Sequence, residues 1–336
     1  MNAAANDRRN GSQLVAETLH AEMARDSSII VLGEDVAELG GVFGATRGLL
    51  RDYGPERVLD TPISETAFIG AAIGAAQVGL RPVVELMFVD FLGVCFDQIA
   101  NEMAKHRYMS AGGMPVPLVL RTATGCIGAA AQHSQVLSAT FAHIPGLKVA
   151  FPSTPGDLRG MLLTAIRDPD PVVILEHKWL LKSRVSELRY CEDLSSAAEP
   201  VPFGRVRRLR AGGDVTIVAA GFMVQHALTA ADQLAQEGLE VGVVDLRTLV
   251  PLDREGLARE AGCADALLVV DDDYADYGMC GELIATIAEQ LGSAAPRMAR
   301  HAVDVPIPAS RILEEAVVPS AASIAAAARR LASVTA

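Results

Sequence analysis

The sequence predicts an α/β protein of two domains, each a mostly parallel sheet with helices on both faces. Short apolar segments alternate with helical ones along the chain, which is typical of parallel sheets covered by helices. The alternation is interrupted once, by the polar and proline-containing segment 181–204, which we interpret as an interdomain connection. The length of 336 residues also suits two domains of about 150 residues each.

The first half of the chain supplies its strands and helices in turn. Apolar residues at helical spacing, or clusters of small residues, indicate helices over residues 13–24, 70–76, 91–104 and 157–167. Short apolar runs indicate strands over residues 27–33, 57–60, 81–88, 117–122, 147–151 and 171–175. Several of these runs end in polar residues, and the carboxyl ends of strands are where open α/β sheets bind ligands.

A second α/β unit follows the polar segment. We expect strands over residues 215–221, 240–245 and 266–271, and helices over residues 223–236, 278–291 and 321–331. The predicted organisation is therefore a first domain over residues 1–190, a linker over residues 191–204 and a second domain over residues 205–336.

Composition excludes several classes of partner. The formal net charge of −12 disfavours nucleic acid, whose phosphates an acidic surface repels. The basic runs Arg8-Arg9 and 205–210 are interpreted as solvated faces. No apolar run reaches the ~20 residues of a membrane span, and residues 1–12 lack the apolar core of a signal peptide. Five cysteines without a C-x-x-C pair suit a reducing compartment, so we expect a cytoplasmic protein.

Four residues near predicted strand ends are candidates for chemistry. Glu65 either complements a helix dipole or is a buried carboxyl that shares a proton with a ligand nitrogen. His133, in AAAQHSQ, is either a structural histidine or faces a ligand in a loop of small residues. Glu34 either caps and solvates a loop or faces the same edge. Phe91 is either core or a platform for a ligand.

Other polar residues favour structural interpretations. Asp168 and Asp170, in RDPDP, fit a turn that closes a helix, with a cation site of oxygen ligands as the alternative. The acidic run 271–273 fits a solvated strand end, with a metal site as the alternative. His143 and His177 are interpreted as structural. The nucleotide-binding patterns G-x-x-x-x-G-K-[ST] and G-x-G-x-x-G are absent, as is the hydrolase pattern G-x-S-x-G.

A series of longer motifs resembles one family. They are GEDV, LDTPISE, AAIGAAQVGLRPVVELMFVDF, DQIANEMAKHRYMSAGG, AAQHSQ, HIPGLKVAFPSTP, AIRDPDPV, VDLRTLVPLD and DVPIPASRILEEAVVPS. In this order and spacing they resemble the beta subunits of the thiamin diphosphate-dependent component of 2-oxo acid dehydrogenases, of the pyruvate and acetoin type within the transketolase-like proteins. The resemblance covers nearly the whole chain.

The resemblance implies a pyrimidine-binding domain followed by a transketolase C-terminal-like domain. By that resemblance, Glu65 hydrogen-bonds the pyrimidine of thiamin diphosphate, Phe91 packs on it and Glu34 lies nearby. His133 matches a histidine implicated in passing the acyl group to a lipoyl arm. A potassium site of some members matches Leu118, Ala165, Ile166, Asp168 and Asp170.

An absent motif implies a partner. Thiamin enzymes bind Mg²⁺ and the diphosphate through GDG and a later Asn, whereas this chain has no GDG and no asparagine after Asn101. The resemblance therefore implies an alpha subunit that holds Mg²⁺ in an α₂β₂ heterotetramer, together with a lipoyl-bearing acyltransferase component. A stand-alone transketolase-like enzyme is disfavoured for the same reason.

The expected substrate is acetoin or pyruvate, because ELMFVDF, AAQHSQ and LEHK resemble acetoin-cleaving members and pyruvate members share AAQHSQ and DVPIP. The alternatives are a branched-chain 2-oxo acid dehydrogenase beta subunit or a non-catalytic structural subunit of the same fold.

Overall fold

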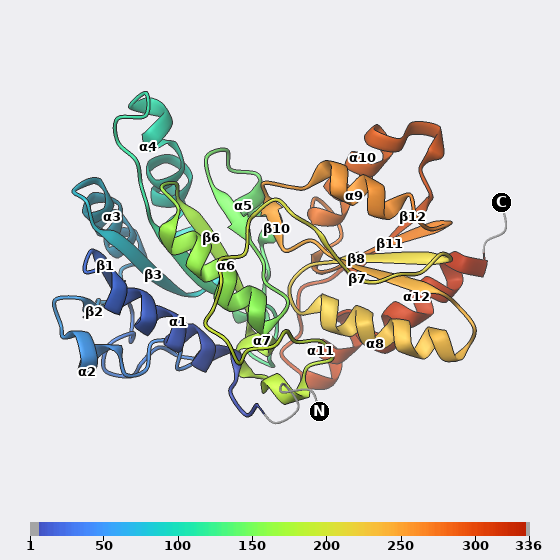
Figure 1. Ribbon diagram of the computed structural model, residues 1–336, viewed down its shortest axis with the longest axis horizontal. Helices are drawn as coiled ribbons and strands as arrows, with labels where there is room; N and C mark the ends of the chain where they lie inside the picture. Colours follow the sequence, from blue (N-terminus) through green and yellow to red (C-terminus); the bar gives the residue numbers. More distant parts are fainter. Residues whose placement is uncertain (1–6, 334–336) are drawn as a thin grey trace.

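The computed structural model describes residues 7–333 and contains two α/β domains side by side (Figure 1). Part of segment 1–12, in which no signal core was predicted, lies outside the described residues. Within the described residues, no helix is long and apolar enough to cross a membrane. The predicted fold class is confirmed, because both sheets are mostly parallel and both carry helices on two faces.

The first sheet has seven strands in the order β10-β5-β6-β4-β3-β1-β2. Six of them belong to the first domain and pair in parallel. They are β1 (Ile29–Gly33), β2 (Val58–Asp60), β3 (Arg81–Phe88), β4 (Val119–Thr124), β5 (Lys148–Ala150) and β6 (Val172–His177). β4 and β6 are buried along their whole length, as expected of central strands covered on both faces. The seventh strand, β10 (Thr248–Val250), comes from the second domain and pairs antiparallel with β5.

Helices cover both faces of this sheet. On one face α1 (Gly11–Arg25) and α6 (Pro155–Arg167) pack on the strands with α2 (Leu49–Tyr53) and α7 (Lys178–Lys182). The other face is covered by α3 (Glu65–Gln77), α4 (Ala104–Met109) and α5 (Ser138–Ala142). The helix predicted over residues 91–104 is instead a 3-10 helix over Val89–Val94 and a π-helical segment over Gln98–Met103. Gly93 lies in the first of these, and glycine weakens a regular helix.

The second sheet has five strands in the order β12-β11-β8-β9-β7. They are β7 (Arg207–Arg210), β8 (Val215–Ala219), β9 (Val241–Asp245), β11 (Ala266–Tyr274) and β12 (Arg297–Val303). Only β7 pairs antiparallel among these described strands. One face of this second sheet is covered by α8 (Met223–Gln236) and α12 (Ala321–Ser333). The other face is covered by α9 (Arg254–Ala261) and α10 (Met279–Leu291). The last remaining α-helix in the described chain, α11 (Arg311–Val317), precedes α12.

The two domains share buried contacts. One apolar core runs from α3 and β4 in the first domain to α9 and α10 in the second. The acidic run 271–273, predicted to be solvated, is buried at the end of β11, and this prediction was wrong. Asp273 accepts hydrogen bonds from Ser138, and Asp272 pairs with His177. The first domain therefore covers and binds these carboxylates.

The basic run at residues 205–210 differs from its prediction at Arg207. The side chain of Arg207 is largely buried and pairs with Asp157, Glu192 and Asp245. Asp157 lies in the first turn of α6 in the first domain and also binds Arg247 at 2.8 Å. This ionic cluster joins β7 and β9 to the first domain, so Arg207 makes an interdomain contact, whereas Arg205 and Arg208 are exposed as predicted.

Candidate active site

The carboxyl ends of four neighbouring strands each supply a buried polar atom without a partner among the described residues. Glu34 follows β1, Thr61 follows β2, Asp90 follows β3, and Ser134 lies in the loop after β4. The atoms are Glu34 Oε1, Thr61 Oγ1, Asp90 Oδ2 and Ser134 Oγ. Since buried polar groups in proteins are normally hydrogen-bonded, and β2, β1, β3 and β4 are consecutive in the sheet, this edge is the candidate ligand site.

Two of the predicted site residues form a carboxyl pair at this edge. Glu34 and Glu65 are each 7% exposed, and Glu65 is the first residue of α3. Burial raises the pKa of Glu34 and the nearby charge of Glu65 raises it further, while the backbone N–H of Ser64 opposes the shift. Two carboxyls in one buried site disfavour double ionisation, so Glu34 holds its proton more readily than an exposed glutamate does.

Four aromatic rings at the same sheet edge form an aromatic wall, made of Phe43, Phe88, Phe91 and His133. The ring of His133 stacks on Phe88, with centroids 5.1 Å apart and planes at 23°. Phe91 meets both rings edge-on, at 5.8 Å from Phe88 and 5.7 Å from His133. Phe43 meets Phe88 edge-on at 6.0 Å. The structure thus brings Phe91 and His133 together, as predicted for residues of one site, and adds Phe88.

Sequence reasoning missed a buried ionic triad within the same sheet. Arg121 on β4 donates to Glu85 on β3 at 2.9 Å and to Glu176 on β6 at 2.7 and 2.8 Å. Burial raises the pKa of Glu176, and the Arg121 guanidinium partly opposes that effect. The available signal was one charged residue inside each of three apolar strands. Breaking such a buried triad is costly, so these residues fix the three strands relative to one another.

Four of the five residues of the predicted potassium site, Ala165, Ile166, Asp168 and Asp170, lie at or just after the end of α6, and Leu118 directly precedes β4. The carbonyl oxygens of Ile166 and Asp168 accept hydrogen bonds from Arg81 at 2.9 and 3.1 Å. The Asp168 and Asp170 carboxylates bind Lys148 at 2.7 and 3.0 Å. The carbonyls of Leu118 and Ala165 accept backbone N–H groups. An all-oxygen donor set fits a monovalent cation, although Arg81 and Lys148 already supply positive charge there.

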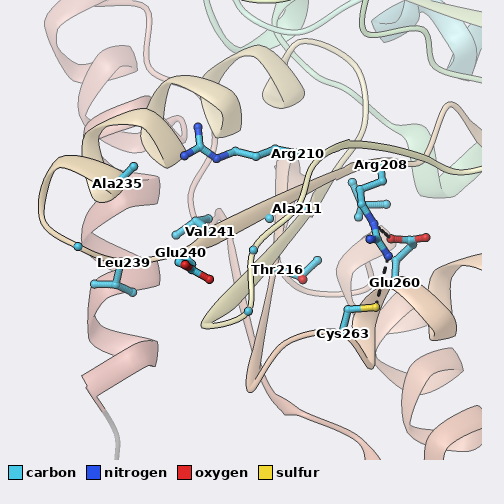
Figure 2. Close-up of a pocket in the computed structure, with 15 residues that line it drawn as sticks. Arg208, Arg210, Ala211, Thr216, Ala235, Leu239, Glu240, Val241, Glu260 and Cys263 are labelled. Atoms are coloured by element: carbon cyan, nitrogen blue, oxygen red, sulfur yellow. Dashed lines mark hydrogen bonds and ion pairs between the residues drawn. The ribbon is translucent and has the colours of Figure 1, made fainter.

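An open cavity of about 700 Å³ lies elsewhere. It lies where β8 and β9 begin, with Arg208, Arg210, Glu240, Glu260 and Cys263 around it (Figure 2). None of the predicted site residues lines it. Ligands of parallel sheets bind at the carboxyl ends of strands, so this cavity at the amino ends is not our candidate active site.

Comparison with known proteins identifies the family. Residues 9–183 match the pyrimidine-binding domain of transketolase, and residues 204–324 match the transketolase C-terminal domain. The chain is 46% identical over 331 residues to the beta subunit of acetoin:2,6-dichlorophenolindophenol oxidoreductase from Cupriavidus necator, covering 94% of this chain and 95% of that protein. The chain belongs to the beta subunits of the acetoin and pyruvate dehydrogenase family.

Other relatives of this beta subunit agree. It is 40% identical to the Bacillus subtilis beta subunit of the same name, over 92% of this chain and 93% of that protein. It is 42% identical to subunit beta-2 of the mitochondrial pyruvate dehydrogenase E1 component of Oryza sativa, over 93% of this chain and 83% of that protein. A split-gene transketolase, described as an inactive beta4 tetramer, has the same fold, with a TM-score of 0.79 at 24% identity over 97% of this chain and 99% of that one.

The candidate active site lies within the matched pyrimidine-binding domain of this beta subunit. Glu34, Glu65, Phe91 and His133 all fall within residues 9–183. Such a domain implies thiamin diphosphate as the cofactor. The site fits an aminopyrimidine in its chemistry, because it offers buried carboxyls, unpartnered buried oxygens and an aromatic wall.

Proposed function

We propose that this beta subunit supplies half of the active site of an α₂β₂ thiamin diphosphate-dependent dehydrogenase. The enzyme would cleave acetoin or pyruvate and pass the acyl group to a lipoyl carrier on an acyltransferase component. The observation that supports this proposal is the set of Glu34, Glu65, Phe91 and His133 at one sheet edge. When bound, thiamin diphosphate supplies the electron sink for breaking a carbon–carbon bond.

Each of the four residues has a definite task in this proposal. Glu65 would hydrogen-bond a pyrimidine ring nitrogen, and its burial strengthens such a bond. Glu34 would supply a second carboxyl that retains its proton, in keeping with its raised pKa. Phe91 would pack on the ring and exclude water. His133 would move a proton at a ring nitrogen during acyl transfer.

The alpha subunit would supply what this chain lacks. A diphosphate and its Mg²⁺ need hard oxygen ligands, and the family's GDG motif is not in this sequence. The relatives from Cupriavidus necator and Bacillus subtilis are likewise called beta subunits. The cofactor would therefore lie between the two kinds of subunit, with its pyrimidine on this chain.

Two smaller proposals accompany this function. The five cysteines are free in the structure, and a reducing compartment such as the cytoplasm would keep them so.

Potassium would bind the oxygens around Ile166 and Asp168 through their second lone pairs. A higher thermal unfolding midpoint in potassium chloride than in sodium chloride at equal ionic strength would support this site. Equal midpoints in the two salts would contradict it.

The deciding experiment is reconstitution with the cognate alpha subunit. The pair is given thiamin diphosphate and Mg²⁺, and dye reduction is followed with acetoin, pyruvate and a branched-chain 2-oxo acid. We expect activity with acetoin or pyruvate only from the pair. Activity of this chain alone would overturn the shared site. A preference for the branched-chain acid would overturn the substrate, and inactivity of a well-folded pair with all three would favour a structural subunit.

A further inference from the structure

A fully buried lysine lies behind the loop that carries His133. Lys178 begins α7 directly after β6 and is 0% exposed. Its Nζ donates to the carbonyl oxygens of Gly125 and His133, both at 2.7 Å. The ammonium also lies 4.9 Å from the centroid of the Phe88 ring. A buried ammonium is costly unless it is bonded, and here two carbonyls and a π-face surround it.

These contacts reach His133 by two routes. One hydrogen bond fixes its backbone carbonyl, and Phe88 is the ring on which its imidazole stacks. The second hydrogen bond fixes Gly125, the first residue after β4. The Lys178 side chain therefore contacts the start of the loop at Gly125, its middle at His133, and the Phe88 ring on which the imidazole stacks.

The loop needs such ties because its backbone is strained. Ala130 and Leu137, on either side of His133, have φ of +63° and +52°, and non-glycine residues rarely adopt this left-handed region. On the far side of His133 from Gly125, Asp90 accepts hydrogen bonds from the backbone and side-chain N–H groups of Gln135 at 3.2 and 3.0 Å. A strained loop persists only where its surroundings hold it.

We propose that Lys178 is a positioning residue for the acyl-transfer step, acting by holding the loop and ring platform that orient His133. The inference rests on the proposed function, because the role given to Lys178 depends on the acyl-transfer role proposed for His133. Lys178 has no exposed surface, so it acts through His133 and does not touch the substrate.

Charged groups around Lys178 come from several elements. Burial lowers its pKa to about 8, while the carboxylates of Asp90 after β3, Asp272 on β11 and Glu314 on α11 favour the charged form. A neutral amine makes weaker hydrogen bonds to carbonyls than an ammonium does. The tie should therefore weaken as the pH rises through about 8.

The test compares two activities of the reconstituted α₂β₂ enzyme, dye reduction and acyl transfer to lipoamide. Lys178→Met keeps the length of the side chain and removes its charge and donors. We expect acyl transfer to fall by roughly tenfold to a hundredfold, and to fall more than dye reduction. Lys182→Met, on the same helix but exposed, is the matched control and should leave the ratio of the two activities unchanged.

A double-mutant cycle separates positioning from a general structural role. If Lys178 acts through His133, adding Lys178→Met to His133→Ala should change the ratio no further. Full additivity, or a wild-type ratio in Lys178→Met, would overturn the inference. A wild-type pair inactive with acetoin and pyruvate would instead overturn the proposed function.

A pH profile keeps the inference testable if Lys178→Met fails to fold. In the wild-type enzyme the ratio of acyl transfer to dye reduction should decline above about pH 8. In Lys178→Arg, whose guanidinium stays charged, that decline should move to higher pH. Identical alkaline limbs in the two proteins would contradict the role of Lys178.

Discussion

The imidazole of His177 and the carboxylate of Asp272 form a hydrogen bond across the domain interface, with Nε2 2.8 Å from Oδ2. Both side chains are buried. The backbone N–H of Trp179 donates to Nδ1 of the same ring at 3.1 Å. Nδ1 is therefore the acceptor and Nε2 carries the proton that it donates to Asp272. The bond joins the end of β6 to β11 with a fixed ring tautomer.

Removing this imidazole should destabilise the protein markedly. His177→Leu leaves a buried carboxylate without its donor, and the expected loss is about 3 kcal/mol of unfolding free energy, measured by urea denaturation. The control is the pair His20–Asp52, which has the same 2.8 Å separation but is exposed. His20→Leu should have a much smaller effect. Equal losses in the two variants would show that burial does not set the strength of the His177 contact.

The ionic cluster at Arg207 should give stability a distinct pH dependence. Burial and the neighbouring Asp157 carboxylate together raise the pKa of Asp245 to about 7, against the opposing charge of Arg207. Between the ordinary aspartate pKa of about 4 and about 7, folded Asp245 keeps a proton that the unfolded chain has lost. The Asp245 contribution to unfolding free energy therefore falls as the pH rises through this window and levels off above it. Asp245→Asn should lose this contribution; parallel stability curves for the two proteins would contradict the assignment.

Loss of the Glu65 carboxyl should impair catalysis more than folding. Glu65→Ala removes the group proposed to hydrogen-bond the pyrimidine, so dye reduction by the reconstituted pair should fall by about a hundredfold or more. Glu237→Gln, an exposed glutamate at the end of α8, is the control. Wild-type rates in Glu65→Ala would refute the role given to this residue.

His133→Ala should separate the two half-reactions. Because His133 is proposed to act during acyl transfer, transfer to lipoamide should fall by at least about tenfold more than dye reduction. Phe88 and Phe91 keep the wall in place in this variant, so cofactor binding should be retained. Equal losses in both assays would argue for a general role of the histidine.

Gly125 should be far less tolerant than a second glycine of the same loop. Both Gly125 and Gly128 have left-handed backbones, with φ of +83° and +79°. A Cβ at Gly125 would meet the His177 ring at 2.4 Å, whereas nothing lies within 4 Å of one at Gly128. Backbone strain of about 1 kcal/mol applies to both alanine variants. Gly125→Ala should lose at least about 2 kcal/mol more in urea denaturation because the buried ring must move; equal losses would contradict this crowding.

Local patterns in the sequence predicted many of the regular elements. β3 and α8 have the predicted bounds, 81–88 and 223–236, because a continuous apolar run and a clear helical periodicity mark them. Other elements carry no such mark. β7 and β12 are edge strands with several arginines, and β10 has three residues. Their pairing partners, not their own side chains, make them strands.

The sequence by itself determined the two α/β domains and the family, and it predicts a partner that holds Mg²⁺ and the diphosphate. It also placed Glu34, Glu65, Phe91 and His133 near strand ends, because strand ends can be read from local hydrophobicity. Only the tertiary structure decided what surrounds them. Buried pairs such as His177 and Asp272 join residues 95 positions apart, and no local pattern records which distant segments will exclude water together. For the same reason, nothing in the local sequence predicts that Lys178 is buried and donates to two carbonyls of the His133 loop.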